Sequence, residues 1–518
     1  MAYRVHQVNR QTGVTYVYEA TSFWNKEKQQ PRNKQVCIGK IDSRTGAFIP
    51  SKRFNSEQVA VRDPAVTATA LVAGPSMILD SITFELKLDK VLKACFLQFW
   101  QQVLCMAYYL VQCGGPLSHC EAWSKSHVQP YTNILTSQRI SDILKALGDD
   151  GRQTFFARWG KKVLENDYLC YDITSVSSYG ELNEYAKYGY NRDREKLRQI
   201  NLALLAGQKS QLPVYYNRLP GNISDVSTLH RFLKTFDYLN LPNLHLVLDK
   251  GFYSQKNMNE LLVSRDKFVI AVPNNLKWAQ QIIDENRDTI QNPECYLKME
   301  GEILYVRTKL YPWGDMRKRC YVHLYYNSYI SAAAANDFTE GLLVCKQELE
   351  SNQPVIEHED AYNNFFIVKE TPVRGRKVFF NHEAIEKYRN RYAGSYMILT
   401  NDIKNPMEAL RVYRDKDVIE KCFDDLKNQL DMKRLRVQNS TAMDGRLFVQ
   451  FIALILTCAL RKKMRDTGLI EKYTPRELLM EMETLTQIRY SGRYGQILTE
   501  ITKPQKKILE NLNIQSHT

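Results

Sequence analysis

Two aspartates stand where a β-strand would carry a reactive carboxylate. In YLCYDITS, the two-residue period of a strand puts Asp172 on the face away from Tyr171 and Ile173. The run LHLVLDKGF is almost continuously apolar and ends in Asp249, which is typical of a strand buried on both faces. Because active sites of α/β sheets gather at the carboxyl ends of strands, both aspartates are candidate catalytic acids.

A third acidic segment, VYRDKDVIEKCFDDLK, is helical in pattern. On a continuous helix, one face would carry Tyr413, Lys416, Glu420 and Lys427. This arrangement suits a metal-binding Glu420 beside side chains that hold DNA phosphates. The pattern also fits an ordinary salt-bridged helix surface, and spacing does not choose Glu420 over the neighbouring acids Asp417, Asp424 and Asp425.

Three carboxylates on separate elements indicate two-metal phosphodiester chemistry. Such a set holds two Mg²⁺ ions about 3.5–4 Å apart, with Mn²⁺ as a substitute. One ion activates water or a 3′-hydroxyl, and the other stabilises the leaving oxygen. The cofactor predicted for Asp172, Asp249 and one acid of the helical segment is therefore a pair of Mg²⁺ ions in each active site.

The elements that must position these acids form a mixed pattern. Three strand-like segments in succession, followed by strands separated by helices, are expected of an RNase H-like α/β sheet, although other α/β topologies fit too. The predicted organisation is an N-terminal β-rich module (1–77), a helical and candidate DNA-binding region (78–165), the first part of an RNase H-like core (166–275), a β-rich insertion domain (276–395), the second part of the core (396–500) and a C-terminal tail (501–518).

Composition and charge narrow the class of protein. The chain has 518 residues, 44% of them hydrophobic, and a formal net charge of +14, which favours an anionic partner such as nucleic acid. Its eleven cysteines show no pairing pattern, as expected in a reducing cytosol. The apolar run LFVQFIALILTCAL is shorter than the roughly 20 residues of a bilayer span, so we expect a buried helix and no membrane partner.

Several other side chains could bind a metal, stack on a base or support the acids. Cys113, His119 and Cys120 lack a fourth zinc ligand at a standard spacing, so they are interpreted as structural. Trp313 could stack on an unpaired base, but a packed position at a turn is the favoured interpretation. Asp193 is a candidate to support the metal-binding acids from outside.

Taken together, these segments resemble the DDE transposases of bacterial insertion sequences, in the group that has a β-rich insertion and a Y-x2-R-x3-E-x6-K signature. Tyr413, Lys416, Glu420 and Lys427 fit its spacing, with Lys416 in place of Arg. That replacement keeps the charge but loses bidentate phosphate geometry. GYNRDREKLRQINLALL, LPVYYNRLPGNISDVSTL and LHLVLDKGF are also similar to family segments, so the resemblance covers most of the chain.

The resemblance implies roles for these residues. Asp172, Asp249 and Glu420 would be the catalytic and metal-binding acids, and the signature frame selects Glu420 over its neighbours. DNA-binding contacts to the transposon-end phosphates would come from Tyr413, Lys416 and Lys427. Where family members often have Gly-His, this chain has Gly445-Arg446, a change that we expect to be tolerated.

The implied activity is cut-and-paste transposition. The protein would bind the terminal inverted repeats of its element, cleave double-stranded DNA, and join the 3′-hydroxyl to target DNA in the bacterial cytoplasm, associated with the nucleoid. A synaptic complex of two ends needs at least a homodimer. Two alternatives stay open: a site-specific nuclease without strand transfer, and a domesticated, non-catalytic DNA-binding protein, against which the three retained acids argue.

Overall fold

The computed structural model describes residues 2–25, 29–51, 67–164, 168–179, 184–223, 225–238, 244–314, 317–371, 375–388, 392–435, 440–491 and 495–515. The chain divides into two compact units, which are described separately. The first comprises Met1–Thr69 and Ile488–Gln496, and the second comprises Ala70–Gln487 and Ile497–Thr518. The first unit thus ends earlier in the sequence than the predicted module boundary at residue 77.

The first unit holds an antiparallel sheet in the order β1-β2-β3-β4. Its strands are β1 (Ala2–Val8), β2 (Thr15–Asn25), β3 (Gln30–Ile41) and β4 (Phe48–Pro50). Between β3 and β4, the Asp42 carboxylate accepts hydrogen bonds from the backbone N–H groups of Arg44 and Thr45. Gly46 follows with φ of +67°, a conformation that glycine adopts without strain. The SRTG segment therefore makes the turn that its composition indicates.

The second unit is built on a ten-stranded sheet in the order β11-β12-β13-β16-β10-β9-β6-β7-β8, with β17 paired to β6 off this path. Its strands are β6 (Leu169–Ser178), β7 (Gln199–Gly207), β8 (Pro213–Pro220), β9 (His245–Leu248), β10 (Lys267–Val272), β11 (Tyr296–Met299), β12 (Glu302–Trp313), β13 (Lys318–Tyr326), β16 (Ser395–Thr400) and β17 (Arg434–Leu435). Strands β6, β9 and β10 run parallel to one another, whereas β6, β7 and β8 are antiparallel neighbours. Helices α8 (Asp225–Tyr238) and α9 (Gln255–Val263) connect β8 to β9 and β9 to β10.

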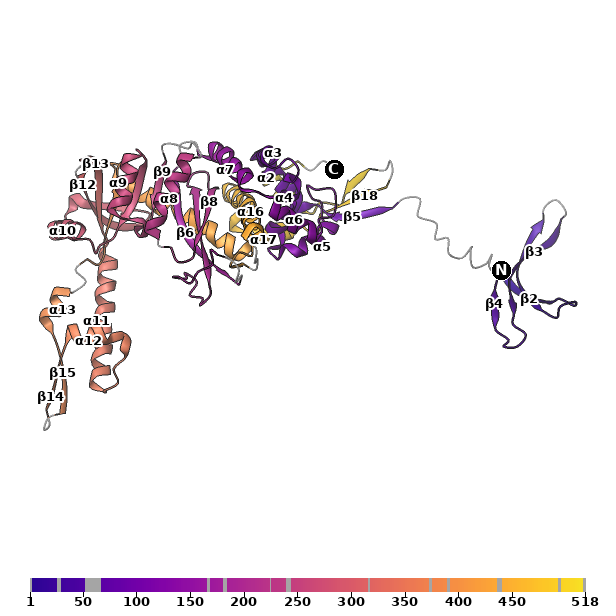
Figure 1. Cartoon of the computed structure of the whole chain (residues 1–518), viewed down its shortest axis with the longest axis horizontal. Helices are drawn as coiled ribbons and strands as arrows, with labels where there is room; N and C mark the ends of the chain where they lie inside the picture. Colours follow the sequence, from indigo (N-terminus) through magenta and orange to yellow (C-terminus); the bar gives the residue numbers. More distant parts are fainter. Residues whose placement is uncertain are drawn as a thin grey trace. The chain divides into compact units, whose positions relative to one another are not determined.

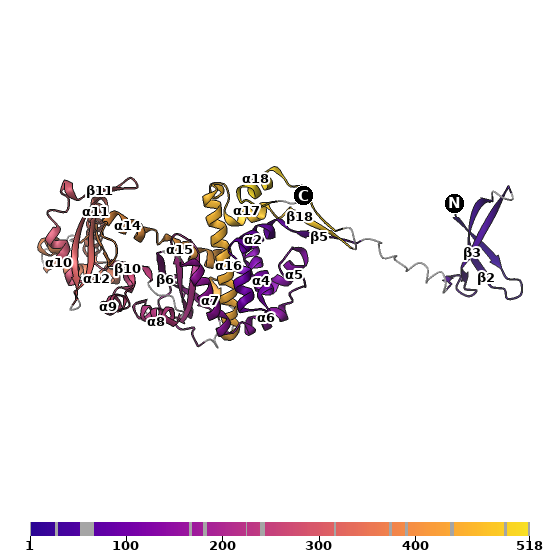
Figure 2. The ribbon, with the colours of Figure 1, turned by 90° about the horizontal axis from the view of Figure 1, so that it is seen from above.

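A helical region packs around the long helix α16 (Ser440–Asp466). Its helices are α2 (Gly74–Glu85), α3 (Leu88–Cys95), α4 (Trp100–Cys113), α5 (Cys120–Ser126), α6 (Ser137–Ala146) and α7 (Asp149–Val163). Both ribbon views place α16 between the sheet and α4 (Figures 1 and 2). The helix is long and apolar enough to span a membrane, but 94% of its apolar window is buried inside the unit. It is the buried core helix that we expected.

Close backbone packing joins α16 to α6. A Cβ atom on Gly445 would lie 2.0 Å from the carbonyl oxygen of Leu144, so only glycine fits at this crossing. A side-chain cap begins α6, because the Thr136 side chain accepts a hydrogen bond from the N–H of Arg139. Ile140 and Leu144 on α6 are buried in the main core. These contacts favour a packing role for α6 over a base-reading role.

Residues 276–395 differ from the β-rich insertion that we predicted. This range does contain strands, but three of them, β11, β12 and β13, extend the large sheet. Residues 328–388, which we call the hairpin lobe, are mostly helical. They comprise α11 (Ser328–Glu350), η4 (Ile356–His358), α12 (Glu359–Phe365), the hairpin of β14 (Phe366–Thr371) and β15 (Gly375–Phe380), and α13 (His382–Tyr388). The side chain of Asn327 caps α11 by accepting hydrogen bonds from two backbone N–H groups, and the alanine-rich run that follows is a strong helix former.

The end of the chain is more ordered than the predicted tail. After α17 (Pro475–Glu481), a small sheet has the order β19-β18-β5, from β19 (Gln496–Leu498), β18 (Thr486–Tyr490) and β5 (Ala68–Val72). Helix α18 (Lys503–Asn511) then begins with a capping box between Thr502 and Gln505. Ile508 and Leu509 are buried in the main core. The TKPQ sequence carried this start signal, which the tail assignment overlooked.

Candidate active site

The strand register places Asp172 and Asp249 side by side. Strands β6 and β9 are parallel, with Tyr171 opposite Leu248, and the two aspartates are the next residues along each chain. Every other residue of β6 is buried, whereas Asp172 is half-buried. The two acids predicted from strand patterns therefore meet at the carboxyl end of β9, where Asp172 keeps contact with solvent.

Asp249 is held by two donors from the signature segment. The Tyr413 hydroxyl donates to Asp249 Oδ1 at 2.7 Å, and Lys416 Nζ lies 3.1 Å from the same oxygen. Burial raises the pKa of Asp249, but the hydrogen bond from Tyr413 and the charge of Lys416 lower it, and the net pKa is below the usual value. Asp249 is therefore ionised at neutral pH. Its side chain is 40% exposed.

Tyr413 lies within electrostatic reach of all three predicted acids. Burial raises its pKa first, and the charge of Asp249, the hydrogen bond to Asp249, and the charges of Glu420 and Asp172 raise it further. The phenol consequently stays protonated and acts as a donor at neutral pH. Asp249 thus contacts this hydroxyl group directly, and Glu420 and Asp172 act on it only through their charges.

The signature segment is not the single continuous helix that its spacing suggests. Helix α14 (Pro406–Arg414) ends before Asp415, and α15 (Asp417–Asp424) begins after Lys416. A π-helical turn, η5 (Asp425–Gln429), follows, in which the N–H of Leu430 bonds the carbonyl of Asp425 at 3.0 Å. Such turns insert an extra residue and recur at functional sites. The prediction that all four signature side chains share one helical face is therefore wrong in its geometry.

Glu420 is the most exposed of the three acids. Its side chain is 61% exposed, and its carboxylate lies 4.0 Å from Lys416 Nζ. Lys416 thus stands between Asp249 and Glu420 and balances both charges. Two of the three competing acids have other surroundings: Asp424 accepts a hydrogen bond from Asn428, and Asp425 is fully buried.

Lys427 points to a different partner from the other signature residues. Its ammonium bonds both carboxylate oxygens of Asp193, at 2.9 and 2.8 Å, and it is only 13% exposed. Asp193 was a candidate for outside support of the acids, and it is found bound to this lysine. The pair joins η5 to the loop before β7.

Two further anchors of the segment were not predicted. Arg461 on α16 makes a bidentate ion pair with Asp425; burial raises the pKa of Asp425, to about 6, against the opposing effect of Arg461. Gln208 donates to the carbonyl of Val412 at 2.6 Å and to Cys170 Sγ at 3.4 Å, which ties β6 to α14. Neither residue has a local sequence signal, because both contacts bring together distant parts of the chain.

The donor set of the three acids fits hard divalent cations, since Mg²⁺ prefers carboxylate oxygens. In the part of the chain that the structure describes, one trio of ligand atoms lies within 4.8 Å of one another, and it belongs to the hairpin lobe. The three acids are thus more widely spaced than that, with the ammonium of Lys416 near two of them. Binding of a cation would require the carboxylates to draw together and Lys416 to yield its place.

The structure also shows the surroundings of the tryptophan and of the cysteine-histidine group that the sequence singled out. Trp313 is 4% exposed and its indole N–H donates to Asn259 Oδ1 at 2.7 Å, so it is packed rather than available for base stacking. Cys113, His119 and Cys120 are not among the metal-ligand groups found in the described residues.

Comparison with known proteins gives one family match. The profile of the family described as "Transposase DDE domain" matches residues 165–456, more than half of the chain and all six predicted site residues. A solved structure titled "Cryo-EM structure of piggyBac transposase synaptic complex with hairpin DNA" is 8% identical, with a TM-score of 0.35, over 86% of this chain and 83% of that chain. At that score the likeness supports no argument about the site. A search of curated proteins finds no match.

Proposed function

The chain belongs to the family of transposases with a DDE domain, and from this premise we propose that it cuts and joins DNA with Asp172, Asp249 and Glu420. The observation that carries the assignment is the parallel register of β6 and β9, which brings two acids together beside Tyr413 and Lys416. The strand order β8-β7-β6-β9-β10 supports an RNase H-like core, formed from residues 166–275 and 396–500.

The three acids would hold two Mg²⁺ ions, or Mn²⁺ in their place. When bound, the ions supply an activated oxygen nucleophile and stabilise the leaving oxygen of the phosphodiester. The protein's own part is to keep Asp249 ionised and correctly oriented, which the hydroxyl of Tyr413 does by donating to Oδ1. Outer hydrogen bonds of this kind orient metal-binding carboxylates.

The contacts revise the DNA-binding roles that the resemblance implies. Lys416 is 25% exposed and has three donors, so it remains suited to meeting a phosphate once a cation takes over the charge of Asp249. Tyr413 and Lys427 are instead bound to Asp249 and Asp193. We therefore assign Tyr413 and Lys427 as positioning residues and Lys416 as the phosphate contact.

The biological reaction follows as cut-and-paste transposition. The protein would bind the terminal inverted repeats of a bacterial element, hydrolyse the 3′ strand, and transfer the resulting 3′-hydroxyl to target DNA. Each of two paired ends needs an active site, so the working form would be a homodimer. The net charge of +14 supports a large phosphate-binding surface.

An excision and integration assay tests the proposal. A plasmid carrying candidate ends is incubated with Mg²⁺ and wild type, Asp172→Ala, Asp249→Ala or Glu420→Ala, with Asp424→Ala as the control on the same helix. We expect all three acid variants to lose cleavage and joining, and the control to retain both. Undiminished activity in any acid variant would refute its role. Cleavage without joined products identifies the nuclease alternative, and end binding alone identifies the domesticated one.

A further inference from the structure

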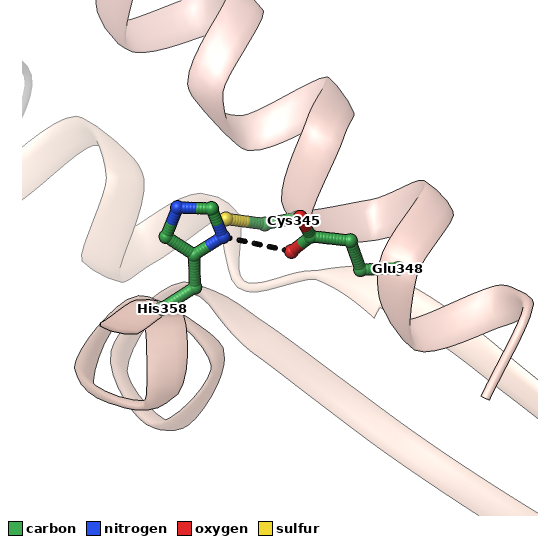
Figure 3. A group of neighbouring side chains, drawn as sticks. All are labelled: Cys345, Glu348 and His358. Atoms are coloured by element: carbon green, nitrogen blue, oxygen red, sulfur yellow. Dashed lines mark hydrogen bonds and ion pairs between the residues drawn. The ribbon is translucent and has the colours of Figure 1, made fainter. Parts of the chain in front are cut away.

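A second group of metal-binding side chains lies in the hairpin lobe, outside the acid site. Cys345 and Glu348 are three residues apart on α11, so they share one face of the helix. His358 ends the short helix η4, and its ring turns toward both (Figure 3). One ligand atom from each residue lies within 4.8 Å of the other two.

The carboxylate of this trio is fixed by its neighbours. Glu348 Oε2 accepts a hydrogen bond from the Tyr362 hydroxyl and lies 2.8 Å from His358 Nδ1. The same hydroxyl accepts a hydrogen bond from the N–H of Val355 at 3.0 Å. One phenol thus connects the ligand carboxylate to the loop that presents the histidine, as outer hydrogen bonds do in metal sites.

The donor chemistry is that of zinc rather than magnesium. Thiolate, imidazole and carboxylate are the ligands of tetrahedral Zn²⁺, whereas Mg²⁺ is held by oxygen atoms. Ligand bonds of about 2.0–2.3 Å require neighbouring donors to be roughly 3.5 Å apart. Donors that lie up to 4.8 Å apart would have to move closer, and His358 Nδ1, which is 2.8 Å from Glu348 Oε2, would have to exchange this hydrogen bond for the metal. Cys345 is 4% exposed and His358 is 40% exposed, which leaves a side open for water as a fourth ligand.

The hairpin lobe has few buried residues of its own, so a bound metal would add to its stability. Its hydrophobic core is separate from the main core and consists of Leu342, Cys345, Leu349, Phe366 and Val378. Small folded units with so few buried residues commonly depend on a metal or a disulfide. A metal held by Cys345, Glu348 and His358 would fasten η4 to α11 at the edge of this small core.

We propose that Cys345, Glu348 and His358 form a Zn²⁺ site, with water as its fourth ligand, that holds the hairpin lobe together. Binding forms a bond between the metal and Cys345 Sγ and releases the thiol proton to solvent. None of the three residues belongs to the acid cluster, so metal binding here can be measured separately from the DNA reaction.

Metal titration of the full-length chain tests the site. Metal-free protein is titrated with Co²⁺ in excess Mg²⁺, which occupies the carboxylate site, and the thiolate-to-cobalt charge-transfer absorption is recorded. We expect one equivalent of Co²⁺ to produce the band and Zn²⁺ to abolish it. Absence of a band in the wild-type protein, or a band that requires many equivalents, overturns the proposal.

Variants locate the bound ion. The band should be lost in Cys345→Ser and changed in shape or affinity in His358→Ala and Glu348→Gln, whereas His382→Ala, an exposed histidine of the same lobe, should match wild type. A band that persists in Cys345→Ser overturns the proposal.

Amide hydrogen exchange of the wild-type chain, measured with and without Zn²⁺, tests the metal site without any variant. Protection gained at α11 and η4 supports the site, and unchanged protection there overturns it. The acid variants also separate this proposal from the proposed function. If they lose DNA cleavage but keep the Co²⁺ band, failure of one proposal can be told from failure of the other.

Discussion

Two stretches of one helical segment carry similar charges in opposite surroundings. In the first, residues 413–420, Lys416 pairs with Asp249 and lies 4.0 Å from Glu420, and both side chains reach solvent: Glu420 is 61% exposed and Lys416 is 25% exposed. In the second, residues 425–429, Asp425 is fully buried against Arg461, and Lys427 is 13% exposed on Asp193. The charges of the first stretch are thus partly open to solvent, whereas those of the second are buried in ion pairs within the fold.

The break between α14 and α15 lies within the first stretch, and the π-helical turn η5 forms the second. Buried charges must be paired at fixed positions, and losing one partner leaves the other uncompensated. Rearranging a partly exposed carboxylate costs little free energy, so such a group can exchange a lysine partner for a cation. The comparison assigns chemistry to Glu420 and anchoring to Asp425, although both are acids on the same segment.

The largest expected effect separates activity from stability at the exposed end. Glu420→Ala should reduce DNA cleavage to the level of a reaction without protein, because no other side chain replaces a metal ligand. Its free energy of unfolding should stay within about 0.5 kcal/mol of wild type, as is usual for exposed sites. Cleavage and urea unfolding, measured on the same preparation, check this. A strongly destabilised Glu420→Ala would contradict the comparison.

The buried end should show the reverse. Asp425→Ala leaves Arg461 unpaired and should lower the free energy of unfolding by about 3–5 kcal/mol, as measured by urea denaturation. The matched double variant Asp425→Leu/Arg461→Met removes both charges and should recover most of that loss. If the double variant is no more stable than the single one, the pair is not the anchor described.

A smaller effect is expected at the hydroxyl that orients Asp249. Tyr413→Phe keeps the packing but removes the donor, and loss of such an outer hydrogen bond typically costs about 10–100-fold in activity or metal affinity. Cleavage rates measured over a range of Mg²⁺ concentrations check this, with Tyr396→Phe as a control tyrosine. An unchanged Mg²⁺ dependence and rate would remove the positioning role.

The smallest effect concerns pH. The lowered pKa of Asp249 means that its ionised form stabilises the fold above the unfolded pKa of 3.8, and that this contribution is lost as the pH falls through the lower, folded pKa. The stability difference between wild type and Asp249→Asn should therefore be constant above about pH 5 and should change only below about pH 4. Urea unfolding across this range measures it. A change near pH 6 would contradict the lowered pKa.

The strand positions of Asp172 and Asp249 could be predicted from the sequence because they depend on local pattern. A two-residue period marked β6 and an apolar run marked β9, and parallel pairing placed Asp172 beside Asp249. The helical half was not readable to the same degree. Continuous α-helical spacing predicted one shared face, but the break after Arg414 and the π turn redirect Lys427 to Asp193.

The large sheet and the hairpin lobe show the same limit at the level of the fold. Strands were correctly expected within residues 276–395, but no local pattern says which sheet a strand joins. The lobe's helices follow from Asn327 and an alanine-rich run, a local signal that was outweighed by the neighbouring strand patterns. Contacts such as Asp425 with Arg461 join residues far apart in sequence, so neither periodicity nor spacing announces them.

A metal-specificity switch at Asp172 tests the central claim most directly. Asp172→Cys replaces a hard oxygen donor with a thiolate, which binds Mg²⁺ poorly and Mn²⁺ better. DNA cleavage by this variant should be lost in Mg²⁺ and partly restored in Mn²⁺, while Asp424→Cys should match wild type in both ions. Full activity of Asp172→Cys in Mg²⁺ would contradict a metal-binding role for Asp172.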